Sequence, residues 1–124
     1  MTYDPGWKYK VLGKLLNANM NSVADQAIAL GAAKAIVTDI VVTNPSLSMT
    51  LAAGGFYSAA GKTGLILVPA TQLYSGLLGV ASDVVTPVVT RKRITTGQIF
   101  FALTTAQGVA ATADIYVLGI EADQ

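Results

Sequence analysis

The chain has 124 residues, of which 52% are hydrophobic and only 12% are charged, with a formal net charge of +1. An average domain has roughly 25% charged residues, so we expect much of this surface to be buried against other subunits. Histidine and cysteine are both absent, which excludes a disulfide scaffold and a thiolate metal site and argues against most enzyme classes.

The first predicted strands lie in residues 9–16 and 23–30, YKVLGKLL and VADQAIAL, although each segment by itself also fits a helix. Residues 31–34 form a turn into AIVTDIVVT, residues 35–43, where strand alternation is clear. The alternation predicts two faces: Ile36, Thr38, Ile40 and Val42 on one, and Val37, Asp39 and Val41 on the other. Because Asp39 interrupts an otherwise apolar strand, we expect it to be exposed or paired rather than catalytic.

Three further runs follow, separated by turn residues. Asn-Pro-Ser at 44–46 ends the preceding strand, and LSMTLAA at 47–53 predicts a half-buried strand that pairs with it in a hairpin-like manner. GLILVPA at 64–70 predicts another strand, which its proline ends. VVTPVVT at 84–90 is divided by a proline and therefore predicts an edge or bulged strand.

The last two predicted strands are QIFFALTT at 98–105 and ADIYVLGI at 113–120, both rich in β-branched and aromatic residues. About eight short strands with no sustained helical period predict an all-β fold, a two-sheet antiparallel sandwich or a barrel. A jelly-roll-like sandwich is favoured, with an immunoglobulin-like sandwich as the alternative. We expect residues 1–8 to form an N-terminal arm and residues 9–124 to form a single β-sandwich domain.

Residues 54–64, GGFYSAAGKTG, end like a nucleotide-binding P-loop. The first glycine of that motif would fall at Phe56, and a strand follows the motif where a helix is needed to bind phosphate. We therefore interpret the segment as a small-residue connection between two strands. Lys62 is then a solvated charge or the partner of an acidic neighbour, while Phe56 and Tyr57 offer packing or a contact surface.

Arg91, Lys92 and Arg93 form the one basic cluster, and no aromatic residue flanks it. Strand alternation lets at most Arg91 and Arg93 point the same way, so a nucleic-acid site is disfavoured. The cluster predicts a solvated strand end, with an acidic partner surface as the functional alternative. The seven acidic residues show no spacing that predicts a catalytic pair, a cofactor site or a metal site.

The N-terminal arm carries Tyr3 and Trp7, and Tyr9 follows directly. Such aromatic residues either anchor the chain onto a neighbour or cap its own core, and the sequence leaves both open. The candidate protein-interface residues are therefore Tyr3, Trp7, Tyr9, Phe56, Tyr57, Arg91 and Arg93.

The run AIVTDIVVTNPSLSMTLAAGGFYSAAGKTGLILVPATQLYSGL and the ending TTAQGVAATADIYVLGIEA resemble small structural proteins of tailed-bacteriophage virions. The similarity covers residues 24–121 and leaves the N-terminal arm outside it. Within that group the chain looks most like capsid decoration (cement) proteins, which are jelly-roll-like and sit as dimers or trimers over joints between major capsid subunits. The resemblance brings no catalytic residue with it.

The resemblance implies a non-enzymatic protein on the exterior of a virion capsid. Its implied partners are the major capsid protein and further copies of itself, in a homodimer or homotrimer. No cofactor, nucleic acid or membrane is implied, and no apolar run approaches the roughly 18 residues of a spanning helix. The alternative is a phage tail, head-fibre or receptor-binding module, in which exposed Tyr57 and Tyr74 would bind sugar. A β-fold nucleotide hydrolase would need a carboxylate cluster that the sequence does not show.

Overall fold

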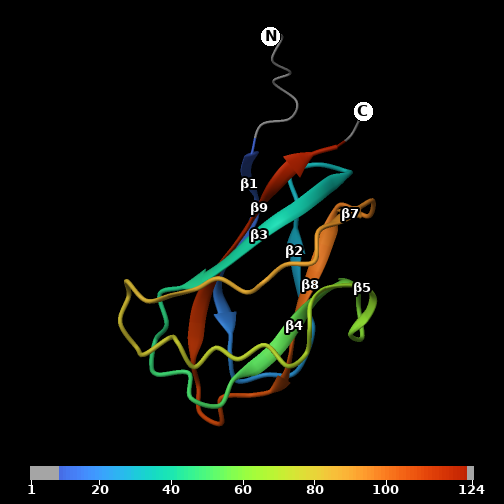
Figure 1. The fold of residues 1–124 in the computed structure, drawn as a ribbon. Coiled ribbons are helices and arrows are strands. Elements are labelled where there is room, and N and C mark those ends of the chain that lie inside the picture. The colour runs from blue at the N-terminus through green and yellow to red at the C-terminus, as the bar shows by residue number, and fades with distance from the viewer. Residues whose placement is uncertain (1–8, 123–124) are drawn as a thin grey trace.

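Within residues 9–122, which the computed structural model describes, the chain forms nine β-strands and no helix (Figure 1). The strands are β1 (Tyr9–Asn19), β2 (Gln26–Ala29), β3 (Ala35–Thr43), β4 (Ala53–Ala59), β5 (Thr63–Val68), β6 (Val84–Val85), β7 (Lys92–Ile94), β8 (Gln98–Thr105) and β9 (Thr112–Glu121). One sheet has the order β1-β9-β3-β6, with β7 also paired to β3, and the other has the order β2-β8-β4-β5.

The strand pairs are nested along the chain. The first strand, β1, pairs with the last, β9, and β2 pairs with the last but one, β8. Inside these pairs, β3 is antiparallel to β6 and β7, and β4 is antiparallel to β5. A long hairpin wrapped into two sheets in this way is a jelly roll, in which β6 and β7 together occupy the place of one strand. The predicted two-sheet antiparallel sandwich is confirmed, and the nested order differs from the immunoglobulin arrangement.

The hydrophobic core lies between the two sheets and receives alternate side chains from both. At its centre the ring of Phe101 lies 4.9 Å from that of Phe56 and meets the ring of Tyr74 edge-on at 6.0 Å, measured between centroids. Fully buried aliphatic residues surround these rings, among them Val37, Ile40, Val42, Ile115 and Val117 from one sheet and Ile28, Leu67, Ile99 and Leu103 from the other. Burial of this apolar surface is the main stabilising contribution to the fold.

Most of the predicted strands are present: residues 35–43 and 98–105 are strands with the predicted bounds, β1 covers all of 9–16, and β2 lies within 23–30. The prediction of a strand at 47–53, paired with 35–43, is wrong. Its physical reason is that β3 and β4 belong to different sheets, so the connecting residues must cross between the sheets. The segment 54–64 was interpreted as a connection, whereas it contains β4 and the hairpin into β5.

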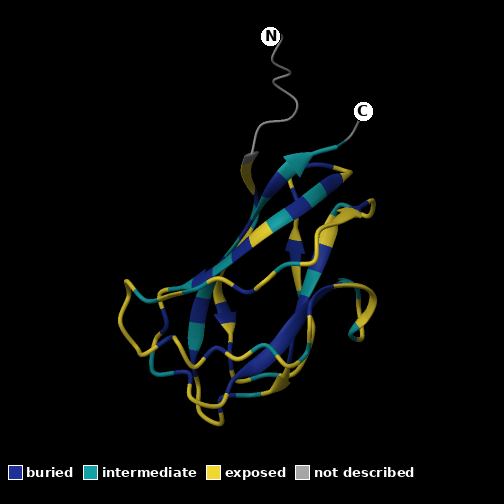
Figure 2. Cartoon of the chain, viewed as in Figure 1, coloured by how far each residue is buried: buried dark blue, intermediate teal, exposed yellow. Residues whose placement is uncertain are grey.

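The predicted faces of β3 are also wrong, because a β-bulge shifts the register between Val37 and Asp39. Val37 is buried before the bulge, and Ile40 and Val42 are buried after it, so the inward side changes from odd to even residues. Figure 2 shows this interrupted alternation along β3. Asp39 lies on the outer side and is exposed, as expected for a charge in an apolar strand.

Gly119 lies in β9, between β1 and β3, where the strands pass too closely for a side chain. A Cβ atom there would lie 2.0 Å from the carbonyl oxygen of Ile36 and 2.9 Å from Cδ1 of Leu12. We expect Gly119→Ala to lower the free energy of unfolding by about 1–3 kcal/mol or more, because the backbone of β3 must move. Guanidinium denaturation measures this change.

Gly31→Ala is the matched control, since a Cβ atom at Gly31 would come no closer than 3.4 Å to any neighbour. Its stability should stay within about 0.5 kcal/mol of the parent protein. Equal stability of the two variants would contradict the close approach of β3 and β9.

Candidate protein-interaction surfaces

Of the three aromatic residues in and next to the N-terminal arm, the structure describes only the backbone of Tyr9. Tyr3 and Trp7 lie outside the described residues. Tyr9 is the first residue of β1, and its Cα atom lies opposite that of Ile120 in β9. The arm is therefore attached to the sandwich at the end of β1 where β9 finishes, and its predicted role stays a prediction.

The prediction of a contact surface at Phe56 and Tyr57 is wrong, because both side chains are buried. They lie on β4, which is covered on both edges by β8 and β5, and Phe56 packs against Phe101 in the core. Tyr74 is also fully buried, and its hydroxyl donates a hydrogen bond to the carbonyl oxygen of Gly54 at 3.0 Å. Neither Tyr57 nor Tyr74 is thus available as a sugar-binding platform.

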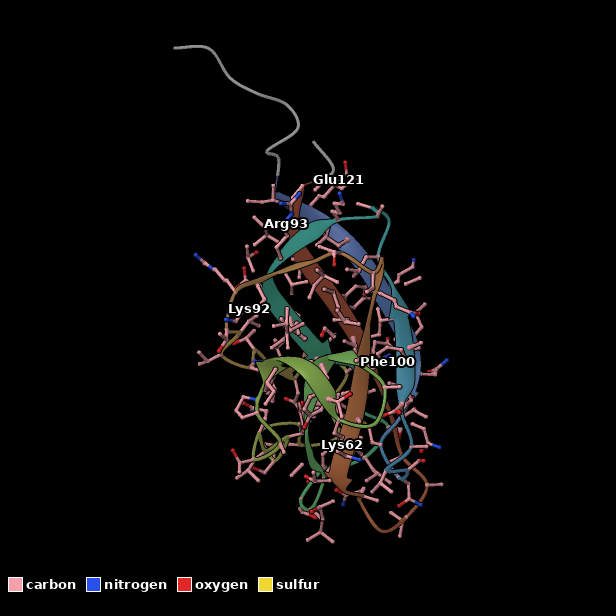
Figure 3. All side chains as sticks on the ribbon, turned by 90° about the vertical axis from the view of Figure 1, so that its right-hand side faces the viewer. Lys62, Lys92, Arg93, Phe100 and Glu121 are labelled. Carbon is pink, nitrogen blue, oxygen red and sulfur yellow. The ribbon has the colours of Figure 1, made fainter. Side chains whose placement is uncertain are left out.

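The basic cluster lies on β7 and just before it, with all three side chains exposed, as a solvated strand end requires. Arg93 donates a hydrogen bond from Nη2 to the carbonyl oxygen of Ala122 at 2.9 Å. Close by, Lys10 forms an ion pair with Glu121, and Figure 3 shows Arg93 and Glu121 at the same end of the molecule. Arg93 and the Lys10–Glu121 ion pair therefore lie at the end of the sandwich where β1 begins.

The residues that resemble a P-loop form the tip of the β4–β5 hairpin. The backbone N–H of Gly61 donates a hydrogen bond to Oδ2 of Asp25 at 2.8 Å, and Nζ of Lys62 donates one to the carbonyl oxygen of Val23 at 3.3 Å. The tip thus contacts the segment between β1 and β2. Figure 3 labels Lys62 at this contact. The anion that this loop binds is the chain's own carboxylate, so it does not present a vacant phosphate cradle.

Four connections meet at the opposite end of the sandwich, residues 20–25, 44–52, 69–83 and 106–111, and together we call them the loop end (Figure 1). Gln107, in the last of these connections, is hydrogen-bonded to two of the others. Its Oε1 accepts hydrogen bonds from the backbone N–H groups of Leu51 and Ala52 at 2.9 and 3.1 Å, and its Nε2 donates one to Thr50 at 3.2 Å. Its own backbone N–H bonds the carbonyl oxygen of Met20 at 2.9 Å. The loop end is consequently cross-linked by hydrogen bonds.

Large apolar side chains are exposed on the loop end, and Figure 2 shows how much of its surface is open to solvent. They are Val23, Leu51, Leu73, Leu78, Val80 and Val109. The four connections contain no basic residue, and their two acidic residues make internal hydrogen bonds. Asp25 binds Gly61, and Asp83 accepts the N–H groups of Leu78 and Val80 at 2.7 and 3.1 Å. Exposed leucines in a charge-poor surface are typical of the core of a protein interface.

This surface carries no sequence motif and was not predicted. The sequence does show that the four connections lack Lys and Arg. This absence indicates a charge-poor surface only once the fold is known to bring the four connections together. Leu73 and Leu78 lie in the long connection between β5 and β6, where isolated bridges pair them with Ala53 and Ser48. Their backbones are therefore fixed, while their side chains are 61% and 64% exposed.

Across residues 9–122 no group of three or more acidic, histidine or cysteine side chains is placed to hold a metal ion. The same part of the chain contains no helix of the length and apolarity that crossing a membrane requires. Comparison of the chain with models of protein families, with curated proteins and with solved structures gave no match.

Replacement of Gln107 tests the hydrogen bonds that hold the loop end together. Gln107→Ala leaves the N–H groups of Leu51 and Ala52 without their acceptor, so we expect a loss of about 1–3 kcal/mol in the free energy of unfolding. Gln98→Ala makes the same chemical change at an exposed position on β8 and should cost less than about 0.5 kcal/mol. Equal denaturation midpoints for the two variants would show that Gln107 does not hold the loops.

Burial, with a smaller contribution from Tyr57, raises the pKa of Tyr74 well above the usual value of about 10. The unfolded chain therefore loses this proton first, so the stability contribution is constant below about pH 10 and falls as the pH rises from there. Burial also raises the pKa of Tyr57, which acts in the same direction.

We expect Tyr74→Phe to be about 1 kcal/mol less stable than the parent protein at neutral pH, because it lacks the hydrogen bond to Gly54. It should lose less stability than the parent between about pH 10 and pH 11, since it lacks the titrating group. Urea denaturation across this range measures both effects. Parallel stability curves for the two proteins would contradict the burial of a neutral Tyr74 hydroxyl.

Proposed function

We propose that the protein is a non-enzymatic structural component of a phage particle, a decoration protein that binds the outside of the capsid shell and stabilises it by bridging major capsid subunits. The observation that carries this proposal is the loop end, a charge-poor surface with exposed leucines on a jelly-roll sandwich. Jelly rolls serve as shell-building domains in viruses, and interface cores are depleted of charge.

The rigidity of the loop end supports this function. Gln107 and Asp83 hold the connections through hydrogen bonds to the backbone, and buried Tyr74 anchors the longest connection in the core. A surface that is already ordered loses little conformational entropy on binding, which favours affinity. The exposed leucines can therefore enter pockets of a partner without a folding step.

The positions of the loop end and of the start of β1, which follows the N-terminal arm in the sequence, fit a bridging role. β1 has 11 residues and runs from the attachment point of the arm to the loop end, a length of about 35 Å. Two contacts at the ends of one rigid sandwich can join neighbouring subunits of a lattice. A protein that binds the assembled shell more tightly than its separated parts stabilises the shell by mass action, and many copies multiply a modest contact.

Replacement of loop-end leucines by a charged residue tests the proposal. Leu73→Asp and Leu78→Asp should each weaken binding to decoration-free shells of the phage that encodes the chain by at least about tenfold, because each puts an unpaired charge into the contact. Co-sedimentation with the shells measures the affinity.

Val88→Asp serves as the control, because Val88 is 85% exposed but lies between β6 and β7, outside the loop end. Its affinity for the shells should equal that of the parent. The proposal fails if the parent chain does not bind the shells, or if all three variants bind as tightly as the parent.

A further inference from the structure

The basic cluster lies at an open edge of the five-stranded sheet. Lys92 and Arg93 belong to β7, which pairs with β3 and with no other described strand, and Arg91 directly precedes β7. All three side chains are exposed, and Figure 3 shows Lys92 and Arg93 along one side of the molecule. We call Arg91, Lys92 and Arg93 the basic edge.

Two charges of the basic edge are not compensated within the described chain. Across residues 9–122, the side chains of Arg91 and Lys92 form no ion pair and no hydrogen bond. By contrast, Lys10 at the same end of the sandwich forms its ion pair with Glu121. Two adjacent cations without a carboxylate partner repel each other, and an anionic partner surface replaces this repulsion by attraction.

The basic edge and the loop end lie at different ends of the sandwich and differ in chemistry. β7 pairs with residues 35–37, which begin β3, and residue 35 also pairs with Glu121 at the end of β9. The basic edge is therefore near the end where β1 begins. The loop end has exposed leucines and no basic residue in its four connections. A bridge that uses both ends makes one contact by apolar burial and the other by charge.

We propose that the basic edge binds an acidic surface of a neighbouring capsid subunit while the loop end holds the first subunit. This contact rests on the proposed function and adds the chemistry of the second half of the bridge. The N–H groups of arginine hold a carboxylate in a bidentate manner, which lysine does not match. Arg91 and Arg93 are two residues apart, about 6.8 Å along an extended chain, so they can hold two carboxylates of one partner at once.

The other polyanion that a basic edge attracts is a nucleic acid, which the surroundings of this edge disfavour. Grooves for single-stranded nucleic acids combine basic residues with aromatic side chains that stack on the bases. The residues of β3 that pair with β7 are Ala35, Ile36 and Val37, and none of them is aromatic. A net charge of +1 also gives the chain little general attraction for phosphate. An acidic protein surface therefore fits the basic edge better.

Salt distinguishes the two contacts of the bridge. Screening shortens the range of charge interactions from about 10 Å at 0.1 M salt to about 3 Å at 1 M, whereas the burial of leucines is not a charge interaction. Two linked contacts bind more tightly than either alone. We therefore expect the affinity of the chain for the shells to fall as the salt concentration rises and to level off at the strength of the loop-end contact.

Co-sedimentation of the full chain with decoration-free shells of the phage that encodes it, from about 0.05 M to about 1 M NaCl, tests the second contact. Arg91→Glu should weaken binding at least about fivefold at about 0.1 M salt and flatten the salt dependence, because it turns an attraction into a repulsion. Arg91→Lys keeps the charge without the bidentate geometry and should weaken binding by about twofold to threefold.

Lys14→Glu is the charge-matched control, because Lys14 is exposed on β1, at the other edge of the same sheet. It should bind the shells like the parent chain at every salt concentration. A thermal melt of each variant establishes that it is folded.

The possible results separate this contact from the proposed function. A parent chain that does not bind the shells at any salt concentration overturns both. If the parent binds and Leu73→Asp weakens it, while Arg91→Glu binds like the parent, the second contact is wrong and the loop-end contact stands. Binding of the parent to a DNA duplex of about 20 base pairs at about 0.15 M salt, lost in Arg91→Glu, would make nucleic acid the partner of the basic edge and overturn the acidic surface.

Discussion

The pairing of β1 with β9 is the constraint on which the other features depend. It joins the two ends of the described chain, and each following pair, β2 with β8, then β3 with β6 and β7, then β4 with β5, lies inside it. Because every second connection then emerges at the same end of the sandwich, four segments distant in sequence converge there. The loop end is a product of this nesting, and so is the start of β1 at the opposite end.

Much of the fold was predictable because most strands carry their own alternation. Residues 35–43 and 98–105 have bounds that the pattern predicts, since apolar side chains there face a core on one side. The bulge after Val37 was not predictable, because it depends on how β3 passes Gly119 of another strand. The pattern at 47–53 indicated a strand, yet the change of sheet between β3 and β4 overrides local propensity.

The interaction surfaces were less predictable than the strands. Phe56 and Tyr57 follow two glycines, a context typical of an exposed turn, and only the position of β4 between two other strands buries them. The loop-end leucines carry no motif, and only the fold brings them together. Composition did indicate exposed apolar surface, because a chain with 12% charged residues has few charged groups with which to cover it.

The nested strand order also determines when the protein can fold during synthesis. Of the described strands, β1 leaves the ribosome first and its sheet partner β9 leaves last, so β1 and β9 cannot join β3 until all nine strands have been made. Pairings between residues so distant in sequence form slowly, because a large loop must close first. Until then β1 and the edge of β3 that faces β9 stay unpaired, and such edges are prone to aggregate. A ribosome that stops before residue 112 therefore releases a chain that lacks the central strand of one of its two sheets.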